Sequence, residues 1–209
     1  KIHFSNGIGE LNQAIHRLKF DEHFFLQLLM ALRKRSLQHS GSLPLPDIGP
    51  YFKLISETLD FELTDAQKKV IKEIHSDLKN PIPMNRLLQG DVGSGKTIVS
   101  ILISALAVGN NAQVAMMVPT EILATQHFHS FKSELKKVNI PCALLVGNMK
   151  KLDRSPILAG LENGKIPMVI GTHALIQEDV NFKNLGLVVV DEQHRFGVNQ
   201  RAKLVEKGN

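Results

Sequence analysis

A glycine-rich stretch between two apolar segments carries the clearest chemical signature in the chain. It covers residues 86–100 and has the sequence RLLQGDVGSGKTIVS. It fits the phosphate-binding pattern G-x-x-x-x-G-K-[ST], with these loop residues: Gly90, Gly93, Ser94, Gly95, Lys96 and Thr97. Glycines let the backbone bend so that its N–H groups point at phosphate oxygens. Lys96 would reach the β- and γ-phosphates, and the Thr97 hydroxyl would ligate Mg²⁺. The stretch therefore predicts a P-loop for ATP and magnesium.

A second strong signature is a hydrophobic strand that ends in two adjacent carboxylates. Residues 187–194 read LVVVDEQH. In P-loop ATPases such a strand delivers an aspartate, here Asp191, to the magnesium shell. The neighbouring Glu192 could polarise the attacking water as a general base. Alternatively, the two carboxylates only cap the next turn. Their combination with a P-loop favours the catalytic interpretation.

Two softer sites follow other expected strands, Val118-Pro119-Thr120-Glu121 and Gly171-Thr172-His173. Small hydroxyl residues and backbone amides at helix starts are good phosphate ligands. They are also ordinary helix N-caps. The residue types alone leave both roles open for Thr120 and Thr172.

The stretch 61–67, FELTDAQ, also has two interpretations. Thr64 and Gln67 form a T-x-x-Q capping box at the start of an apolar-periodic helix. The Gln67 amide also offers one donor and one acceptor, as recognition of an adenine edge requires. The sequence chemistry does not distinguish these roles, and both can hold.

The elements that would position these residues alternate along the chain. Continuously apolar strands are expected at 86–89, 113–118, 142–146, 167–170 and 185–190, with helices at 96–108, 121–138 and 156–163. Strands of this kind are typical of sheets buried on both faces. The alternation predicts an α/β fold with a doubly wound, mainly parallel sheet. Ligands of such sheets bind beyond the carboxyl ends of the strands, where the motifs fall.

The first 49 residues are expected to form a separate helical segment. Residues 1–19 suit a short amphipathic piece, and a stronger helix is predicted at 22–37 with Asp21 as its N-cap. Residues 40–50 hold three prolines and two glycines, which indicates a linker. The predicted domains are therefore 1–49, a helical connection and linker, and 50–209, an ATP-binding lobe.

The bulk composition is that of an ordinary soluble protein with a basic surplus. The net charge is +5 and hydrophobic residues make up 43%, which is compatible with a polyanionic partner. The single cysteine, Cys142, excludes an internal disulfide and fits a reducing cytoplasm. The longest apolar run, 98–108, is too short to span a bilayer, and the first residues show no signal-peptide pattern.

Together these residues resemble superfamily 2 helicases, most closely the bacterial RecG type that acts on branched DNA. The resemblance covers nearly all of 57–209 and extends more loosely over 8–39. Its matching stretches are 61–67, 84–97 (MNRLLQGDVGSGKT), 118–126 (VPTEILATQ), 171–179 (GTHALIQED) and 184–198 (NLGLVVVDEQHRFGV). The run DEQHRFGV is shared by few families, among them the transcription-repair coupling translocases, which remain an alternative.

The resemblance implies roles that residue chemistry left open. Phe61 and Gln67 become an adenine-recognition motif. Thr120, Thr172 and the neighbouring His173 become contacts to the DNA backbone, and His194 becomes a link between the nucleotide site and DNA movement. The fold implied is a RecA-like lobe, preceded by the helical segment.

The resemblance also implies parts that this sequence lacks. Family members carry a second motor lobe and an N-terminal wedge domain that splits branched DNA. They also carry a further strand, ending in Thr-Ala-Thr-Pro, which in related folds lies between the P-loop strand and the Asp191 strand. We therefore expect a truncated lobe that does not unwind DNA alone. Two other function classes remain: a P-loop small-molecule kinase, and a nucleotide-binding module without turnover.

Overall fold

The computed structural model of this chain describes residues 7–38 and 41–208. It divides into two units, Lys1–Gly41 and Ser42–Asn209. Within the described residues, no helix has both the length and the apolar character needed to cross a membrane.

The first unit contains one continuous helix, α1 (Ile8–Gln38). The prediction that Asp21 is an N-cap was therefore wrong. Asp21 lies inside the helix, where its carboxylate accepts a hydrogen bond from Arg17 Nε at 3.1 Å, one turn earlier. No proline or glycine stands between Glu10 and Gln38, so nothing ends the earlier segment before Asp21.

The second unit is built on a parallel sheet of four strands: β1 (Gln113–Met117), β2 (Cys142–Leu145), β3 (Met168–Gly171) and β4 (Leu185–Val190). The strand order is β2-β3-β1-β4, and every pair is parallel. All carboxyl ends therefore meet at one edge, as the alternation of strands and helices predicted. Backbone bonds continue just beyond the strands, from Asp191 N to Met117 O and from Thr172 N to Leu145 O.

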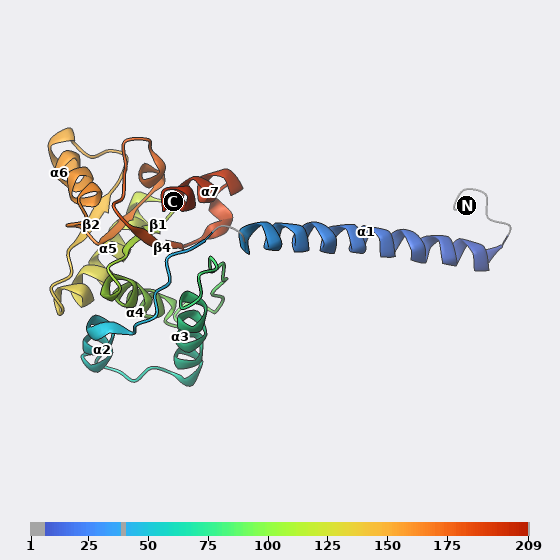
Figure 1. Cartoon of the computed structure of the whole chain (residues 1–209), viewed down its shortest axis with the longest axis horizontal. Coiled ribbons are helices and arrows are strands. Elements are labelled where there is room, and N and C mark those ends of the chain that lie inside the picture. Colours follow the sequence, from blue (N-terminus) through green and yellow to red (C-terminus); the bar gives the residue numbers. More distant parts are fainter. Residues whose placement is uncertain (1–6, 39–40, 209) are drawn as a thin grey trace. The chain divides into compact units, whose positions relative to one another are not determined.

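Helices cover both faces of this sheet (Figure 1). One face packs on α4 (Lys96–Gly109) and α5 (Glu121–Lys136), with α2 (Gly49–Glu57) and α3 (Asp65–Leu78) outside them. The other face packs on α6 (Lys151–Glu162), α7 (Val198–Glu206) and the short 3₁₀ turn η1 (His173–Ile176). A second 3₁₀ turn, η2 (Gln193–Arg195), follows β4. The doubly wound α/β architecture is confirmed.

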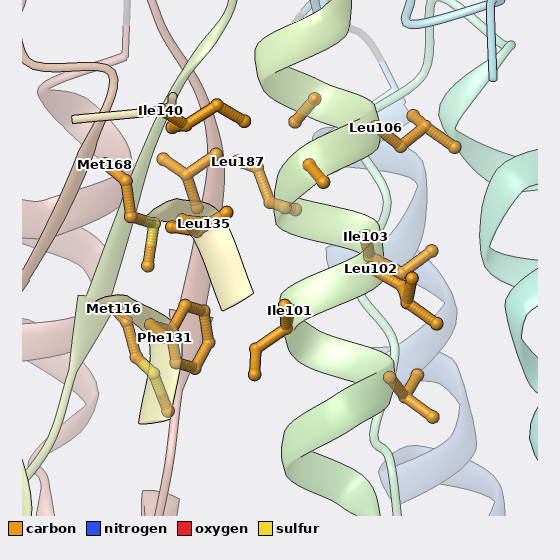
Figure 2. Close-up of a cluster of buried hydrophobic side chains, with 14 of the residues drawn as sticks. Ile101, Leu102, Ile103, Leu106, Met116, Phe131, Leu135, Ile140, Met168 and Leu187 are labelled. Atoms are coloured by element: carbon orange, nitrogen blue, oxygen red, sulfur yellow. The ribbon is translucent and has the colours of Figure 1, made fainter. Parts of the chain in front are cut away.

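The alternating side chains of β1 show why the strands are apolar throughout. Val114 and Met116 point into the core under α4 and α5, whereas Ala115 and Met117 face α6 and α7. Figure 2 shows the first of these cores. Its labelled side chains come from α4, α5, the strands and, for Ile140, the connection between α5 and β2: Ile101, Leu102, Ile103, Leu106, Met116, Phe131, Leu135, Ile140, Met168 and Leu187.

Part of the expected linker packs on the second unit. Leu45 is fully buried in its core, and Leu45 N donates to Leu78 O at the end of α3 at 2.8 Å. Asn110 also pairs with the backbone N–H and C=O of Asp47. Residues 42–48 are therefore attached to the lobe rather than free of it.

The strand predicted at 86–89 is not formed, and this prediction was wrong. Among the described residues the sheet ends at β4, so this segment has no neighbouring strand to pair with. Arg86 instead binds α3, with 2.7 Å ion pairs to Glu73 and Asp77, and Leu87 is 65% exposed. A strand requires a hydrogen-bonded partner, which the apolar run alone cannot supply.

Helix α6 begins at Lys151, five residues before its predicted start at Pro156. Lys150 precedes it in an extended conformation, and its carbonyl accepts from the N–H groups of Asp153 and Arg154. Pro156 thus lies inside the helix, where it removes one backbone donor without ending the helix.

Candidate functional site

Several polar groups of the P-loop form hydrogen bonds with one another in this structure. The Lys96 ammonium donates to Gly90 O at 2.6 Å and to Asp91 O at 2.8 Å. Ser94 N donates to Asp91 O, and α4 begins directly at Lys96. The lysine therefore lies over the loop at the N-terminal end of a 14-residue helix, where an anion is favoured.

Two glycines of the loop have left-handed backbone conformations. Gly93 has φ +82° and Gly95 has φ +80°, values that glycine adopts without steric strain. They differ in their surroundings. A Cβ added at Gly93 would meet nothing within 4 Å, whereas one at Gly95 would collide with the Gln67 side-chain amide. Gly95 is therefore required for the approach of Gln67 as well as for the turn.

Gln67 has two simultaneous roles at the start of α3. Its Oε1 accepts from Thr64 N at 2.9 Å, and its own N–H donates to Thr64 Oγ1 at 3.3 Å, so the predicted capping box is confirmed. Its Nε2 donates to Ser94 O in the P-loop at 3.0 Å. The cap therefore fixes Gln67 in contact with the nucleotide-binding loop. The predicted adenine role is compatible with this position, but no contact tests it.

Phe61, the other predicted adenine residue, is 55% exposed. It lines an open surface depression in the connection between α2 and α3, together with Leu63 and Lys68. An exposed aromatic face beside a helix start can stack on a planar ring. Phe61 therefore remains a predicted contact for the base.

The carboxylate of Asp191, beyond the end of β4, is held through both oxygens. Oδ2 lies 2.9 Å from His127 Nε2 on α5, and Oδ1 accepts from Glu192 N at 2.9 Å. The hydrogen bond from His127 holds the pKa of Asp191 below its usual range, and the charge of Lys96 acts in the same direction. The charge of the P-loop lysine therefore reaches Asp191, a residue predicted from a separate motif, at the carboxyl edge of the sheet.

Glu192 is held very differently from its neighbour. Its backbone lies in the left-handed region, with φ +50°, which is strained for a residue with a side chain. Its side chain is 50% exposed, and its carboxylate lies 3.5 Å from His194 Nε2, which is itself 68% exposed. The turn that follows is fixed through Gln193 O, which accepts from Arg201 at 3.0 Å. Glu192 therefore extends into solvent beside Asp191.

The predicted magnesium ligands supply suitable oxygens. Thr97 is half-buried in the first turn of α4, and Asp191 is half-buried beyond β4. Hydroxyl and carboxylate oxygens are the ligands that Mg²⁺ prefers, usually with several waters and phosphate oxygens. Within residues 7–38 and 41–208 there is no group of three or more His, Cys, Asp or Glu side chains that could hold a metal.

The predicted DNA contacts lie at the same edge but are not equivalent. Thr120 is exposed and is the N-cap of α5, its Oγ1 accepting from Leu123 N at 3.2 Å. His173 is also exposed. Thr172 is only 2% exposed, and its hydroxyl has no partner among the described residues. In this conformation, therefore, the Thr172 hydroxyl is not presented to a ligand in solvent.

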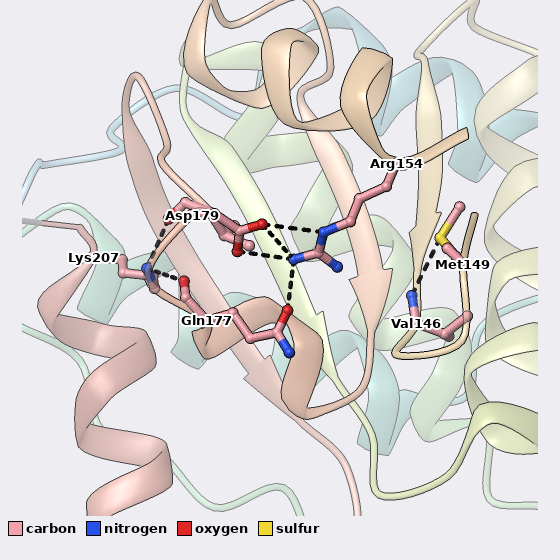
Figure 3. Close-up of polar contacts among 7 residues, drawn as sticks. Val146, Met149, Arg154, Gln177, Asp179 and Lys207 are labelled. Carbon is pink, nitrogen blue, oxygen red and sulfur yellow. Dashed lines mark hydrogen bonds and ion pairs between the residues drawn. The ribbon is translucent and has the colours of Figure 1, made fainter. Parts of the chain in front are cut away.

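The loops after β1, β2 and β3 meet at this edge. A Cβ added at Gly147 would lie 3.7 Å from Glu121 Oε1 and 3.8 Å from His173 Nε2. The loop after β2 is folded on itself, with Val146 N donating to Met149 Sδ at 3.5 Å (Figure 3). The starts of α5 and η1 are thus close neighbours.

A cluster of polar contacts fixes the stretch after η1 (Figure 3). Arg154 of α6 donates to both Asp179 oxygens, at 2.9 and 3.0 Å from Nη2, and to Gln177 Oε1 at 2.7 Å. Lys207 donates to the carbonyls of Gln177 and Val180. The hydrogen bond from Arg154 lowers the pKa of Asp179. These contacts anchor the segment that carries His173.

Sequence reasoning missed His127. A histidine on an amphipathic helix is usually structural, and nothing nearby in the sequence indicates otherwise. Only the fold brings it to Asp191, 64 residues away. The contact between Gln67 and Ser94 was missed for the same reason, since it joins residues 27 positions apart.

Comparisons with known proteins converge on one group. The DEAD/DEAH box helicase family matches residues 64–208. The ATP-dependent DNA helicase RecG of Synechocystis sp. is 48% identical over 210 residues, which cover 100% of this chain and 25% of that protein. RecG of Thermotoga maritima is 47% identical over 99% of this chain and 26% of its own length. The chain thus spans about a quarter of the length of these curated relatives.

Solved structures agree with the sequence comparisons. A structure of RecG bound to a three-way DNA junction is similar with a TM-score of 0.84 and 46% identity, covering 93% of this chain and 27% of that one. The UvsW helicase from bacteriophage T4 is similar in fold alone, with a TM-score of 0.55 and 19% identity over 76% of this chain and 55% of that one.

Proposed function

Because the chain belongs to the DEAD/DEAH box helicase family, we propose that it forms the first ATP-binding lobe of an ATP-dependent DNA helicase that acts on branched DNA in the cytoplasm. Its similarity to RecG helicases supports this substrate class. One arrangement carries the proposal: α4, which begins at Lys96, packs on β4, and Asp191 directly follows β4 at the carboxyl edge of the sheet. The charge of Lys96 contributes there to lowering the pKa of Asp191. The phosphate-binding and metal-binding motifs therefore belong to a single site.

The proposed division of labour follows from the chemistry of each side chain. Lys96 binds the β- and γ-phosphates, exchanging its two carbonyl partners in the loop for phosphate oxygens. Thr97 and Asp191 hold Mg²⁺, which supplies neutralisation of phosphate charge. Glu192, exposed beside Asp191, activates the attacking water. Gln67 and Phe61 recognise adenine.

The proposed DNA contacts use the same edge of the sheet. Thr120 and His173 are exposed there, and backbone amides at the start of α5 add donors for phosphate oxygens. Thr172 contributes through its hydroxyl only after a local shift, because that hydroxyl is now buried. His194, next to Glu192, connects this edge to the nucleotide.

The decisive experiment measures ATP hydrolysis by the intact protein with and without a forked DNA. A DNA-driven motor hydrolyses ATP faster when DNA is present, whereas a small-molecule kinase shows no such stimulation. Strand separation of the fork should accompany hydrolysis in the intact protein. ATP hydrolysis that is indifferent to forked DNA would rule out the proposed function.

Residues 1–209 alone should bind the same DNA weakly, with an affinity that falls steeply as salt rises. The contacts address phosphates, and the +5 net charge adds a counterion-release contribution. This fragment should not separate strands, since unwinding needs two lobes that close around ATP. ATP-dependent strand separation by the fragment, or binding insensitive to salt, would contradict the single-lobe interpretation.

A further inference from the structure

A histidine outside the sequence motifs makes the most specific contact of the site. His127 lies in the second turn of α5, with 14% of its side chain exposed, and its Nε2 is 2.9 Å from Asp191 Oδ2. His129, two residues further along α5, is exposed. The two histidines thus belong to different faces of the helix, and only His127 faces the nucleotide edge.

The His127 ring is held from two sides. Its far side meets Phe131, one turn later, edge to face, with ring centroids 6.5 Å apart at 72°. Phe131 is fully buried in the core shown in Figure 2. The ring cannot turn away from Asp191 without disturbing that packing, so contact with the core keeps Nε2 directed at Asp191.

The Asp191 carboxylate depends on this contact for its orientation. Its Oδ1 accepts from Glu192 N, while Oδ2 has His127 as its partner. The Asp191 backbone is fixed by its N–H to Met117 O at 3.0 Å. With the backbone fixed and one oxygen on the following amide, His127 restrains the remaining rotation of the carboxylate.

We propose that His127 is a positioning residue for ATP hydrolysis, which holds the Asp191 carboxylate in the orientation needed to ligate magnesium. The proposal rests on the proposed function. Groups that orient a metal ligand typically change metal affinity or activity about 10- to 100-fold when removed. Thr120, a predicted DNA contact, is the N-cap of the same helix. The contact of His127 with Asp191 therefore also connects the start of α5 to the proposed magnesium ligand.

Two substitutions in the intact protein separate the hydrogen bond from simple packing. His127→Phe keeps a ring against Phe131 and removes the donor. His127→Gln loses the ring, but its side-chain amide can place a donor near the position of Nε2. If His127 positions Asp191, His127→Gln should keep more of the wild-type activity than His127→Phe. If His127 acts only by packing, His127→Phe should keep more. His129→Phe, on the exposed face of α5, is the matched control and should behave as wild type.

Two measurements report on the proposed magnesium site. The first is the Mg²⁺ concentration needed to bind a fluorescent, non-hydrolysable ATP analogue, which should rise about 10- to 100-fold in His127→Phe and recover largely in His127→Gln. Binding of the analogue without Mg²⁺ should stay unchanged in all variants. The second is kcat for DNA-stimulated hydrolysis, which should fall in the same order.

The ligand-free protein gives an independent measurement. A double-mutant cycle between His127→Phe and Asp191→Asn in urea unfolding should show that the two effects are not additive, because the residues are in contact. Should His127→Phe fail to fold, His127→Leu replaces it as a smaller donor-free variant.

The outcomes distinguish the two proposals. A wild-type protein without DNA-stimulated hydrolysis overturns the proposed function and the positioning role with it. A wild-type protein that hydrolyses ATP, with His127→Phe matching it in Mg²⁺ dependence and kcat, overturns the positioning role alone. A result in which His127→Phe retains wild-type Mg²⁺ dependence and kcat while His127→Gln does not also overturns the positioning role.

Discussion

The two halves of the nucleotide edge are prepared for their ligand to different degrees. In the P-loop, Lys96 and Gln67 bond to backbone carbonyls of the loop itself, at Gly90, Asp91 and Ser94. Beyond β4, Asp191 is already held by His127 and by the amide of Glu192. An incoming phosphate must replace the carbonyl partners of Lys96. The oxygens of Asp191, in contrast, can bind a metal while keeping their hydrogen bonds to His127 and to the amide of Glu192.

The backbones of the two halves differ as well. The left-handed residues of the P-loop are glycines, Gly93 and Gly95, which adopt this conformation freely. Beyond β4 the left-handed residue is Glu192, for which the same conformation costs roughly 1–2 kcal/mol. An incoming nucleotide is therefore expected to rearrange the P-loop, whereas the end of β4 holds a fixed Asp191 carboxylate beside a Glu192 with a strained backbone.

The largest expected effect tests the fixed half. Glu192→Gln keeps the size and hydrogen bonding of the side chain and removes the base. Turnover of ATP by the intact protein should fall about 10²- to 10⁴-fold, while ATP binding should persist because no phosphate ligand is lost. Steady-state hydrolysis and equilibrium binding of a fluorescent ATP analogue measure the two quantities.

Glu206→Gln on α7 removes the same charge from an exposed glutamate and serves as the control. Near-normal turnover in Glu192→Gln would show that the exposed carboxylate is not the base.

The next effect tests the half that rearranges. Lys96→Ala removes a charge from the phosphates, so binding and turnover should both decline. A hydrogen bond to a charged group contributes about 1.5–3 kcal/mol, which corresponds to roughly 10- to 150-fold weaker binding. The same two assays apply, with Lys203→Ala on α7 as an exposed control. A variant that binds ATP normally would show that Lys96 remains on its loop carbonyls.

Much of the fold was predictable because it depends on local pattern. Continuously apolar strands identified β1, β2, β3 and β4, and the capping box of Thr64 and Gln67 located the start of α3. The predicted strand at 86–89 failed because pairing requires a neighbour, which no local pattern reveals. The predicted break at Asp21 failed because a residue that can cap a helix is also tolerated inside one, here paired with Arg17.

The candidate site likewise contains residues that a local motif predicts and contacts that only the folded chain creates. Lys96, Thr97, Asp191 and Glu192 could be proposed from the sequence because phosphate and metal chemistry requires those residue types at fixed spacing. The contact of His127 with Asp191 depends on how α5 packs beside the end of β4, which the spacing of residues in the sequence does not encode. Burial of the Thr172 hydroxyl is likewise a property of the folded chain and could not be read from the motif around it.

The smallest effect concerns Gln67, which lies at the boundary between structure and recognition. A glutamine that reads a base edge leaves polar groups unpaired when guanine replaces adenine, a penalty of about 1–3 kcal/mol, or roughly 5- to 150-fold in affinity. Gln67→Ala should therefore reduce the preference for ATP over GTP, measured by competition with a fluorescent analogue. It should also destabilise the lobe, because the capping box is lost.

Gln67→Glu separates these two roles, since a glutamate can accept from Thr64 N as Oε1 now does but cannot donate to Ser94 O. Circular dichroism and thermal unfolding should find α3 intact in Gln67→Glu, with the nucleotide preference reduced as in Gln67→Ala. If both variants kept the wild-type preference, Gln67 would be a cap that contacts the P-loop and nothing more. If only Gln67→Ala changed it, the preference would depend on the capped start of α3 rather than on the amide donor. Loss in both, with a stable α3 in Gln67→Glu, would make Gln67 a direct determinant of adenine selectivity on the half of the site that rearranges.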